Sequence, residues 1–255
     1  MELQFSQLVW QHAFSLRAFP MRLPQQQIGG FSWELTPNTT MQFHQDCFGN
    51  HVGVGRFDSP HTAFRYEMQG VAWINQQKRR AEQCMPLYRH PSEACRMTPS
   101  MQLFLKDCAI EKRMGVGTTN PVEIAAEYMQ ALHRTFQYQS GATHVSTTAG
   151  EAFAQGSGVC QDYAHILITL CRAGGIAARY VAGMIFGEGA THAWVEVHDG
   201  TMWHGLDPTH NKWIDDGYLK LAHGRDAFDC QLNRGVFCGH AVQQQNVYVN
   251  LEEVL

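Results

Sequence analysis

Residues 156–185 read GSGVCQDYAHILITLCRAGGIAARYVAGMI, and their pattern gives the clearest indication of the protein's architecture. Beyond the loop Gly156-Ser157-Gly158, apolar residues recur at helical spacing between Val159 and Arg172, and Gly174-Gly175 end the pattern. Three strands are predicted to follow, at about 177–186, 191–198 and 201–207. The pattern therefore predicts a helix that starts at Cys160, followed by an antiparallel sheet.

A cysteine at the start of a helix has surroundings that suit a catalytic thiol. The first turn presents unpaired N–H groups and the positive end of the helix dipole, which favour a thiolate and can hold a developing oxyanion. The glycines before Cys160 let a substrate backbone approach closely. A lone cysteine is more often a buried structural thiol, so the interpretation depends on partners elsewhere in the chain.

The predicted hairpin after this helix brings a histidine opposite an aspartate. Asp199-Gly200 is typical of a two-residue type I′ turn, in which His198 pairs with Thr201. The register then runs outward until His192 lies opposite Asp207. Directly opposite residues have Cβ atoms roughly 4.5–5.5 Å apart, which suits a hydrogen bond from imidazole to carboxylate.

On this register the face that carries His192 is expected to meet the helix of Cys160, while the other, apolar face covers the core. A slip of one residue would separate His192 from Asp207. A surface contact between the two side chains, without a functional role, is the alternative interpretation.

These three residue types together indicate nucleophilic catalysis. Cys160 would attack an amide or thioester carbonyl, His192 would take the thiol proton and later donate it to the leaving amine, and Asp207 would fix the ring. The acyl-enzyme would then pass to water or to an amine. Zinc held by the same residues is an alternative, because a triad and a zinc site use the same residue types. We expect neither a metal nor a cofactor.

The composition is that of an ordinary globular protein. Of the 255 residues 44% are hydrophobic and 16% are charged, which is enough to bury a core. The formal net charge is -4, and the basic cluster Lys78-Arg79-Arg80 is interpreted as a solvated face. No signal-peptide pattern or membrane-length apolar run is found. We therefore expect a cytoplasmic protein with reduced cysteines and with neither nucleic-acid nor membrane partners.

The chain divides by pattern into three parts. They are a β-rich N-terminal domain at 1–75, a polar, proline-bearing linker at 76–100 and a catalytic domain at 101–255. The first part reads as short strands separated by turns, which predicts a small β-sandwich or sheet. In the third part, Asn120 and Thr148 are predicted N-caps of two more helices. The fold class is α+β.

The motifs in combination resemble the catalytic core of the transglutaminase-like superfamily. The run at 156–185 is followed by THAWVEV at 191–197 and WHGLDPTHN at 203–211, in that family's order and approximate spacing. The early Asp46-Cys47-Phe48-Gly49-Asn50 is similar to a motif of the β-rich N-terminal domain that bacterial members carry. The resemblance implies a papain-like core, a helix bearing the cysteine packed on an antiparallel sheet, preceded by a small β-sandwich domain. It implies that the triad is Cys160, His192 and Asp207.

The same resemblance implies a cysteine-dependent amide hydrolase, a cysteine protease or amidase, or an acyl transferase that acts on peptide or protein amides. Transamidation to an amine acceptor and a non-catalytic peptide-binding module on the same fold are the alternatives. The family's second oxyanion donor is a side chain upstream of the cysteine, for which Gln155 is a candidate. Gln161 and Trp194 are further candidates for oxyanion or substrate contacts, with core packing equally open for Trp194. His165 and Cys171 are interpreted as packed side chains, and Asp162 as a complement to the helix dipole.

Overall fold

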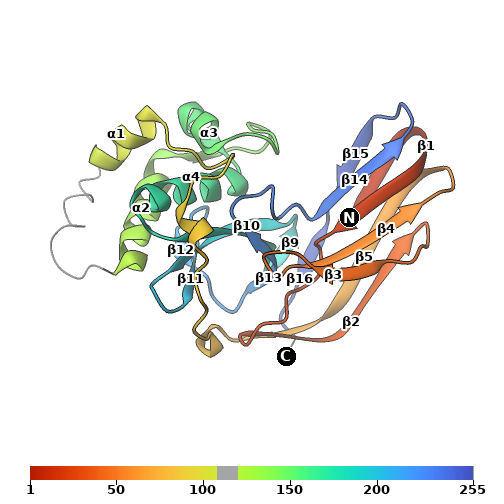
Figure 1. Ribbon diagram of the computed structural model, residues 1–255, viewed down its shortest axis with the longest axis horizontal. Helices are drawn as coiled ribbons and strands as arrows, with labels where there is room; N and C mark the ends of the chain where they lie inside the picture. The colour runs from red at the N-terminus through yellow and green to blue at the C-terminus, as the bar shows by residue number, and fades with distance from the viewer. Residues whose placement is uncertain (108–119, 255) are drawn as a thin grey trace.

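The computed structural model describes residues 1–107 and 120–254, so Cys108 lies outside it. These residues form a β-rich part and an α+β part that lie side by side (Figure 1). The strands are β1 (Glu2–Leu16), β2 (Gln26–Thr36), β3 (Gln42–Gln45), β4 (His51–Phe57), β5 (His61–Ile74), β6 (Gln137–Tyr138), β7 (Ser157–Gly158), β8 (Ala178–Ile185), β9 (Gly187–Gly189), β10 (His192–His198), β11 (Trp203–Asp207), β12 (Lys212–Trp213), β13 (Tyr218–Gly224), β14 (Asn233–Cys238), β15 (Gln243–Asn246) and β16 (Val249–Leu251). The helices are η1 (Gln76–Lys78), η2 (Pro86–Arg89), α1 (Pro99–Asp107), α2 (Pro121–Thr135), α3 (Ala149–Gln155) and α4 (Cys160–Ala173).

The β-rich part is organised around β1, which is 15 residues long. The first half of β1 pairs with β5 and β15, and its second half pairs with β4 and β14. Gln11 lies between the halves with φ at 49°, where the register with the neighbouring strands is interrupted and the strand bends. In the described part of the chain this makes one curled seven-stranded sheet. β1, β2 and β5 are longer than the short strands expected here, and β1 is long because it bends and serves both halves of the sheet.

Residues 233–246 return to this sheet from the far end of the chain. In β14, Asn233 pairs with Leu16, and in β15, Asn246 pairs with Glu2. The sequence division had assigned these residues to the domain at 101–255. Any N-terminal unit therefore has to include β14 and β15, and in other respects the division at 75 and 100 stays a prediction.

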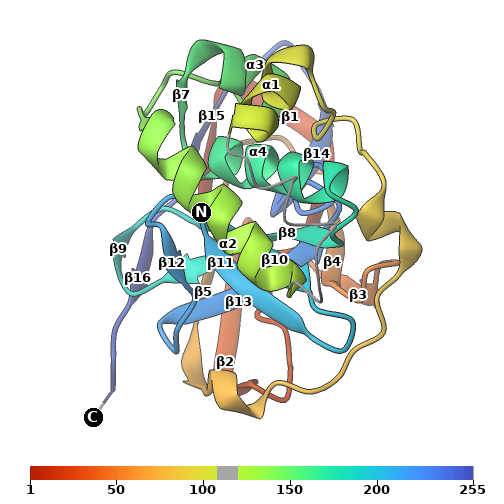
Figure 2. The same cartoon turned by 90° about the vertical axis from the view of Figure 1, so that its left-hand side faces the viewer.

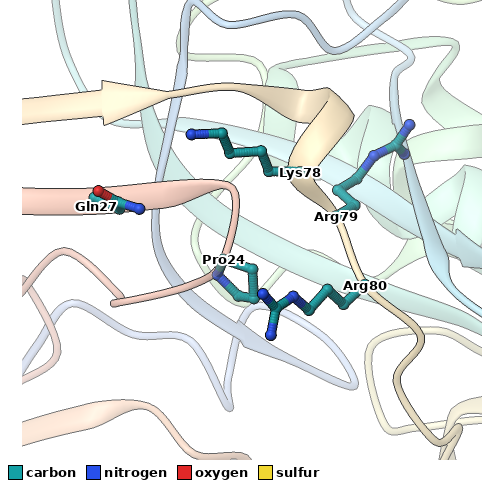
Figure 3. Close-up of a pocket in the computed structure, with 5 residues that line it drawn as sticks. All are labelled: Pro24, Gln27, Lys78, Arg79 and Arg80. Carbon is teal, nitrogen blue, oxygen red and sulfur yellow. The ribbon is translucent and has the colours of Figure 1, made fainter.

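Residues 76–100 connect the two parts. The basic cluster Lys78-Arg79-Arg80 borders a surface hollow of about 570 Å³ (Figure 3). Lys78 and Arg80 are exposed, whereas Arg79 donates to the carbonyl oxygens of Gln76 and Trp203. The cluster thus presents charge to solvent, as the sequence pattern indicated.

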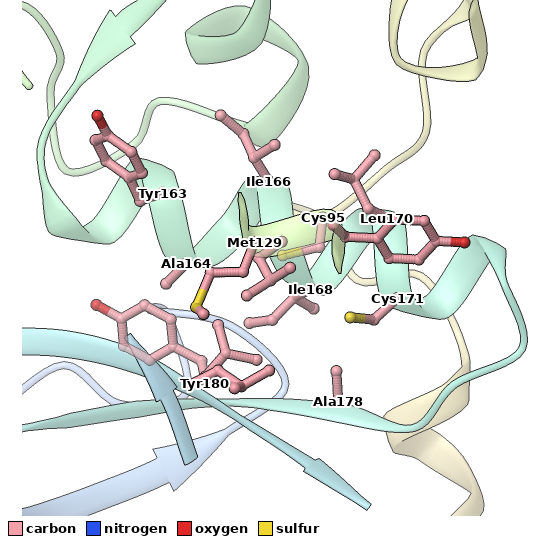
Figure 4. Close-up of a cluster of buried hydrophobic side chains, with 14 of the residues drawn as sticks. Cys95, Met129, Tyr163, Ala164, Ile166, Ile168, Leu170, Cys171, Ala178 and Tyr180 are labelled. Atoms are coloured by element: carbon pink, nitrogen blue, oxygen red, sulfur yellow. The ribbon is translucent and has the colours of Figure 1, made fainter. Parts of the chain in front are cut away.

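The α+β part holds a sheet in the order β12-β11-β10-β8-β13. Helices α2 and α4 lie together over one face of it (Figure 2). Ala164, Ile168 and Cys171 of α4 pack towards Ala178 and Tyr180 of β8 (Figure 4). These side chains share one core and remove their apolar surface from water, which is the main force that holds the helix on the sheet. The predicted helix and the three predicted strands are confirmed as α4, β8, β10 and β11.

The predicted helix starts are confirmed by their caps. The Asn120 side chain accepts from the N–H of Val122 at 3.0 Å. Thr148 and Glu151 form the reciprocal capping box of α3. Among the described residues, no helix is long and apolar enough to cross a lipid bilayer.

The two faces of β10 have different neighbours. Ala193, Val195 and Val197 belong to the core beneath α4, and Trp194 belongs to a separate cluster on the opposite face. The expectation that the His192 face meets the helix was therefore wrong. The apolar stripe of a helix gains most from burial against apolar side chains, so α4 packs on the face of Ala193 instead.

Candidate active site

The hairpin of β10 and β11 has a wider turn than the sequence indicated. His198 pairs with Trp203 and not with Thr201, so the predicted register was wrong by two residues. Asp199 explains the difference, because its carboxylate accepts from two turn N–H groups at 2.7 and 2.9 Å. These bonds stabilise a longer turn than the two-residue type.

His192 and Asp207 meet in spite of this shift. A shift of two residues keeps every side chain on its own face of a strand, whereas a shift of one would reverse it. His192 Nε2 lies 2.8 Å from Asp207 Oδ2, and the ring N–H donates to the carboxylate, whose side chain is fully buried. The predicted contact is therefore present on a different register.

Cys160 and His192 line the same cleft, and Cys160, after Asp207, contributes to the raised pKa of the ring. Because Nε2 of His192 is bonded to Asp207, Nδ1 is the nitrogen left free for a thiol. His192 is the first residue of β10 and Cys160 is the first residue of α4. The imidazole can therefore reach the thiol past the end of the sheet, although α4 packs on the opposite face.

Asp207 accepts hydrogen bonds from three side chains and two backbone amides. Besides His192, its Oδ2 accepts from His210 Nδ1 and from the Tyr218 hydroxyl, both at 2.7 Å. Its Oδ1 accepts from the N–H groups of Thr209 and His210. The sequence analysis missed Tyr218 and His210. The turn after Asp207 can be predicted locally, because aspartate commonly accepts from the backbone N–H two residues later. The contact with Tyr218 cannot be predicted in this way, because Tyr218 lies on a separate strand, β13.

These contacts set the charges of the pair. Burial disfavours ionised Asp207, but hydrogen bonds from His192 and its other donors outweigh burial and hold the pKa of the carboxyl far below its usual range. Burial likewise disfavours charged His192, yet the bonds to Asp207 and Cys160 raise the pKa of the ring from 6.5 to about 9. The two side chains are therefore an imidazolium and a carboxylate at neutral pH.

The start of α4 is fixed by Asp162. Its Oδ2 accepts from the N–H of Val159 at 2.8 Å and from the Thr143 hydroxyl at 2.6 Å. A carboxylate in the first turn also complements the helix dipole, in line with the expectation for this residue. The N–H groups of Cys160 and Gln161 lie in the same turn, where an α-helix offers no carbonyl partner.

A cleft of about 1310 Å³ opens beside Cys160 and His192. Gln161 and Tyr180 border it near the thiol, and Glu67 borders it from the β-rich part. Both parts of the molecule therefore form the walls of the cleft in which the thiol lies.

Of the three candidates for oxyanion or substrate contacts, Gln161 is the one that lines this cleft. Gln155 is the last residue of α3, and its amide donates to the Ala142 carbonyl in the segment before that helix at 2.9 Å. Trp194 is 1% exposed and packs against Tyr218. Of the two roles left open for it, the structure therefore favours core packing.

Two other side chains of α4 lie where the sequence suggested. His165 is buried, its Nε2 accepts from the N–H of Ala227, and burial lowers its pKa to about 4. Cys171 is buried as well, which raises the pKa of its thiol to about 12. Neither side chain belongs to the site around Cys160.

Tyr138 is a residue near the thiol whose role the sequence analysis did not consider. β6 and β7 form a parallel pair that sets Tyr138 beside Gly158, two residues before Cys160. Burial and, after it, the charge of Cys160 raise the pKa of the Tyr138 phenol. The phenol is therefore within electrostatic reach of the sulfur.

Potential metal ligands among the described residues gather at His192, Asp207 and His210. Neighbouring ligands of one tetrahedral zinc ion lie about 3.3 Å apart, given bonds of about 2.0 Å. Asp207 Oδ2 lies 2.8 Å from Nε2 of His192 and 2.7 Å from Nδ1 of His210. These are hydrogen-bond distances, so the cluster is accounted for without an ion.

Comparison with known proteins identifies the family of two regions of the chain. The model of the transglutaminase-like superfamily matches residues 109–208, and that of the bacterial transglutaminase-like N-terminal region matches residues 1–72. A crystal structure of a "putative cysteine protease" from Cytophaga hutchinsonii superposes with a TM-score of 0.73. It is 22% identical and the alignment covers 100% of this chain and 91% of that one. At this identity the likeness concerns the fold.

Uncharacterized mycobacterial proteins are more similar in sequence over part of the chain. One from Mycobacterium tuberculosis is 35% identical over 131 residues, which cover 45% of this chain and 42% of the relative. One from Mycobacterium leprae is 32% identical over 124 residues, which cover 45% and 44%. The matched region thus spans less than half the length of these relatives. With both family regions matched in order and the fold shared end to end, the chain belongs to the transglutaminase-like superfamily and carries the N-terminal region of its bacterial members.

Proposed function

We propose that this protein is a cysteine-dependent amide hydrolase or acyl transferase that acts through a thioester on Cys160. The observation that carries the proposal is the position of His192, which bonds to Asp207 through Nε2 and lines the same cleft as Cys160, with Nδ1 free for the thiol. This arrangement leaves the sulfur in an open cleft beside a proton donor. A structural thiol needs neither feature.

In the first half of the reaction, the Cys160 thiolate attacks the carbonyl carbon of an amide. The carbon–nitrogen bond then breaks, and the amine leaves with the proton from His192 Nδ1. The raised pKa of His192, about 9, keeps that proton available at neutral pH. Asp207 steadies the imidazolium and fixes which nitrogen faces the sulfur.

In the second half, a nucleophile attacks the thioester. His192 accepts a proton from water or from an amine, the carbon–sulfur bond breaks, and the thiolate is restored. Hydrolysis is the default because water is always present, and transamidation differs only in the acceptor. A non-catalytic peptide-binding module on this fold would not require the His192 contact, so we favour the enzyme.

For the oxyanion, we propose two donors. One is the N–H of Cys160, which lies in the first turn of α4 where no intrahelical partner exists. The other is the hydroxyl of Tyr138, which is 60% exposed and lies on the strand beside the thiol. The substrate we propose is a peptide or protein amide, and the cytoplasmic location stays a prediction.

The test compares the reactivity of thiols within one protein. Cys47 and Cys238 are exposed and Cys160 is only half-buried, while Cys95 and Cys171 are buried. We expect iodoacetamide at pH 7 to label Cys160 first, ahead of the more exposed Cys47 and Cys238, because Cys160 shares its cleft with the imidazolium of His192. Labelling in the order of exposure would contradict the proposal.

A second measurement separates hydrolysis from transfer. Peptide amides are incubated with the protein, with and without an added primary amine, and products are identified by mass spectrometry. Acid quenching should trap an acyl group on Cys160. The Cys160→Ala variant should form no adduct, and Cys47→Ala should behave as the native chain. A native chain that releases product without a Cys160 adduct in any quench would refute the thioester route.

A further inference from the structure

The outer edge of β13 is covered by side-chain amides from the β-rich part. β13 is an edge strand of the catalytic sheet, with β8 on its inner side. It lies at the boundary between the two parts (Figure 1). An edge strand leaves N–H and C=O groups without a neighbouring strand, and such groups need partners when they are buried.

Gln26 pairs with one residue of this edge. Its Oε1 accepts from the N–H of Lys220 at 2.7 Å, and its Nε2 donates to the carbonyl of Lys220 at 2.8 Å. The same Nε2 donates to the carbonyl of Met21 at 2.6 Å, and Gln26 is 2% exposed. The amide thus takes the place of a residue in a neighbouring strand.

Asn50 repeats this arrangement further along the edge. Its Oδ1 accepts from the N–H of His223 and its Nδ2 donates to the carbonyl of His223, both at 2.8 Å. Asn50 is fully buried. Two amides from β2 and from the loop before β4 therefore satisfy both polar groups of two β13 residues.

Hydrogen bonds within the loop at 46–50 fix Asn50 in the position from which it contacts His223. Asp46 Oδ1 accepts from the N–H groups of Phe48 and Asn50, and its Oδ2 accepts from Asn50 Nδ2 at 3.1 Å. Arg17 donates to the same Oδ2. Gly49 has φ at 83°, a conformation that favours glycine. This accounts for the sequence motif Asp46-Cys47-Phe48-Gly49-Asn50, for which the reaction itself has no use.

β13 is also the strand that carries Tyr218, which donates to Asp207. We propose that Asn50 and Gln26 are positioning residues of the active site. Through them the β-rich part fixes β13, and β13 fixes the carboxylate that orients His192. This inference rests on the proposed function, since it assigns the two amides a role in that reaction.

The test uses Asn50→Ala and Gln26→Ala in the full chain, with Tyr218→Phe as reference and Gln27→Ala as matched control, because Gln27 is the exposed neighbour of Gln26. Cys160 is alkylated with iodoacetate over a range of pH, and rates are expressed per reactive Cys160. The carboxylate of this reagent is attracted to the imidazolium, so the rate falls when His192 loses its proton. The alkaline limb of the plot of alkylation rate against pH therefore reports the pKa of His192.

We expect Asn50→Ala and Gln26→Ala to move the alkaline limb in the same direction as Tyr218→Phe, by up to about half a pH unit. Each double variant with Tyr218→Phe should move it no further than Tyr218→Phe does, because the amides act through that residue. Gln27→Ala should leave it unchanged. If Asn50→Ala does not fold, Gln26→Ala carries the same prediction.

Two failures can be told apart. If Cys160 of the native chain is not alkylated ahead of the exposed thiols, the proposed function fails. If it is, but the amide variants keep the native alkaline limb while losing only thermal stability, the amides are structural and this inference is overturned.

Discussion

The hydroxyl of Tyr218 donates to Asp207 Oδ2 at 2.7 Å, on the same oxygen that accepts from His192. Burial and the Asp207 charge raise the pKa of the Tyr218 phenol, so it remains a donor at every pH at which the protein would be assayed. His210 donates to this oxygen as well. Asp207 Oδ2 thus accepts from three donors at once, so its hydrogen bond to His192 is weaker than it would be if His192 were the sole donor.

Tyr218→Phe should therefore strengthen the remaining bond between Asp207 and His192. We expect the alkaline limb of the rate profile to move upward by about half a pH unit and the free energy of unfolding to fall by about 1 kcal/mol. Tyr88→Phe is the matched control, because Tyr88 is also buried but its hydroxyl has no partner among the described residues. Equal effects of the two changes on the rate profile would contradict the role given to Tyr218.

Asp207→Asn should move the alkaline limb of the rate profile to lower pH, opposite to the effect of Tyr218→Phe. The pKa of His192 is raised from 6.5 to about 9, so its imidazolium persists below about 9 and is lost as the pH rises through that value. Removing the carboxylate charge lowers this pKa, and the alkaline limb should move towards 6.5. Activity at pH 8 should fall ~10²- to 10⁴-fold. Asp58→Asn, at an exposed ion pair, serves as control and should change neither quantity.

Tyr138→Phe should lower the rate of acylation and leave the fold intact. Loss of one oxyanion donor costs ~10²-fold in kcat, with KM nearly unchanged, because the bond forms only in the transition state. The melting temperature should stay as it is, since the phenol is 60% exposed. Tyr248→Phe removes an exposed hydroxyl that borders the cleft, and it should have little effect on kcat. An unchanged kcat for Tyr138→Phe would remove it as a donor.

Gly183→Ala should distort the floor of the site. Gly183 pairs with His192 across β8 and β10, and a methyl group there would run into the ring of Trp194 and the carbonyl of Leu219. We expect a loss of ~1–3 kcal/mol in the free energy of unfolding, measured by urea denaturation, together with reduced activity. Gly189→Ala, which meets nothing within 4 Å, should cost less than about 0.5 kcal/mol. A neutral Gly183→Ala would show that the Trp194 ring has room to move.

Local rules succeeded where neighbouring residues decide the structure. The N-caps at Asn120 and Thr148 and the helix that opens at Cys160 follow from side chains within a few positions of each other. The hairpin register was wrong because Asp199 bonds to the N–H groups of its own turn, an option that the Asp-Gly rule does not weigh. The contact between His192 and Asp207 survived because the error was an even number of residues.

The α+β core and the helix that starts at Cys160 could be predicted from the sequence, because hydrophobic period and capping depend on residues a few positions apart. The face of β10 that meets α4, the donors that share Asp207, and the return of residues 233–246 to β1 became known only with the folded chain. These depend on segments far apart in the chain, where the burial of apolar faces and the pairing of buried polar groups choose among arrangements that local patterns leave equal. Asn50 and Tyr218 are the clearest cases, because each finds its partner more than ten positions away.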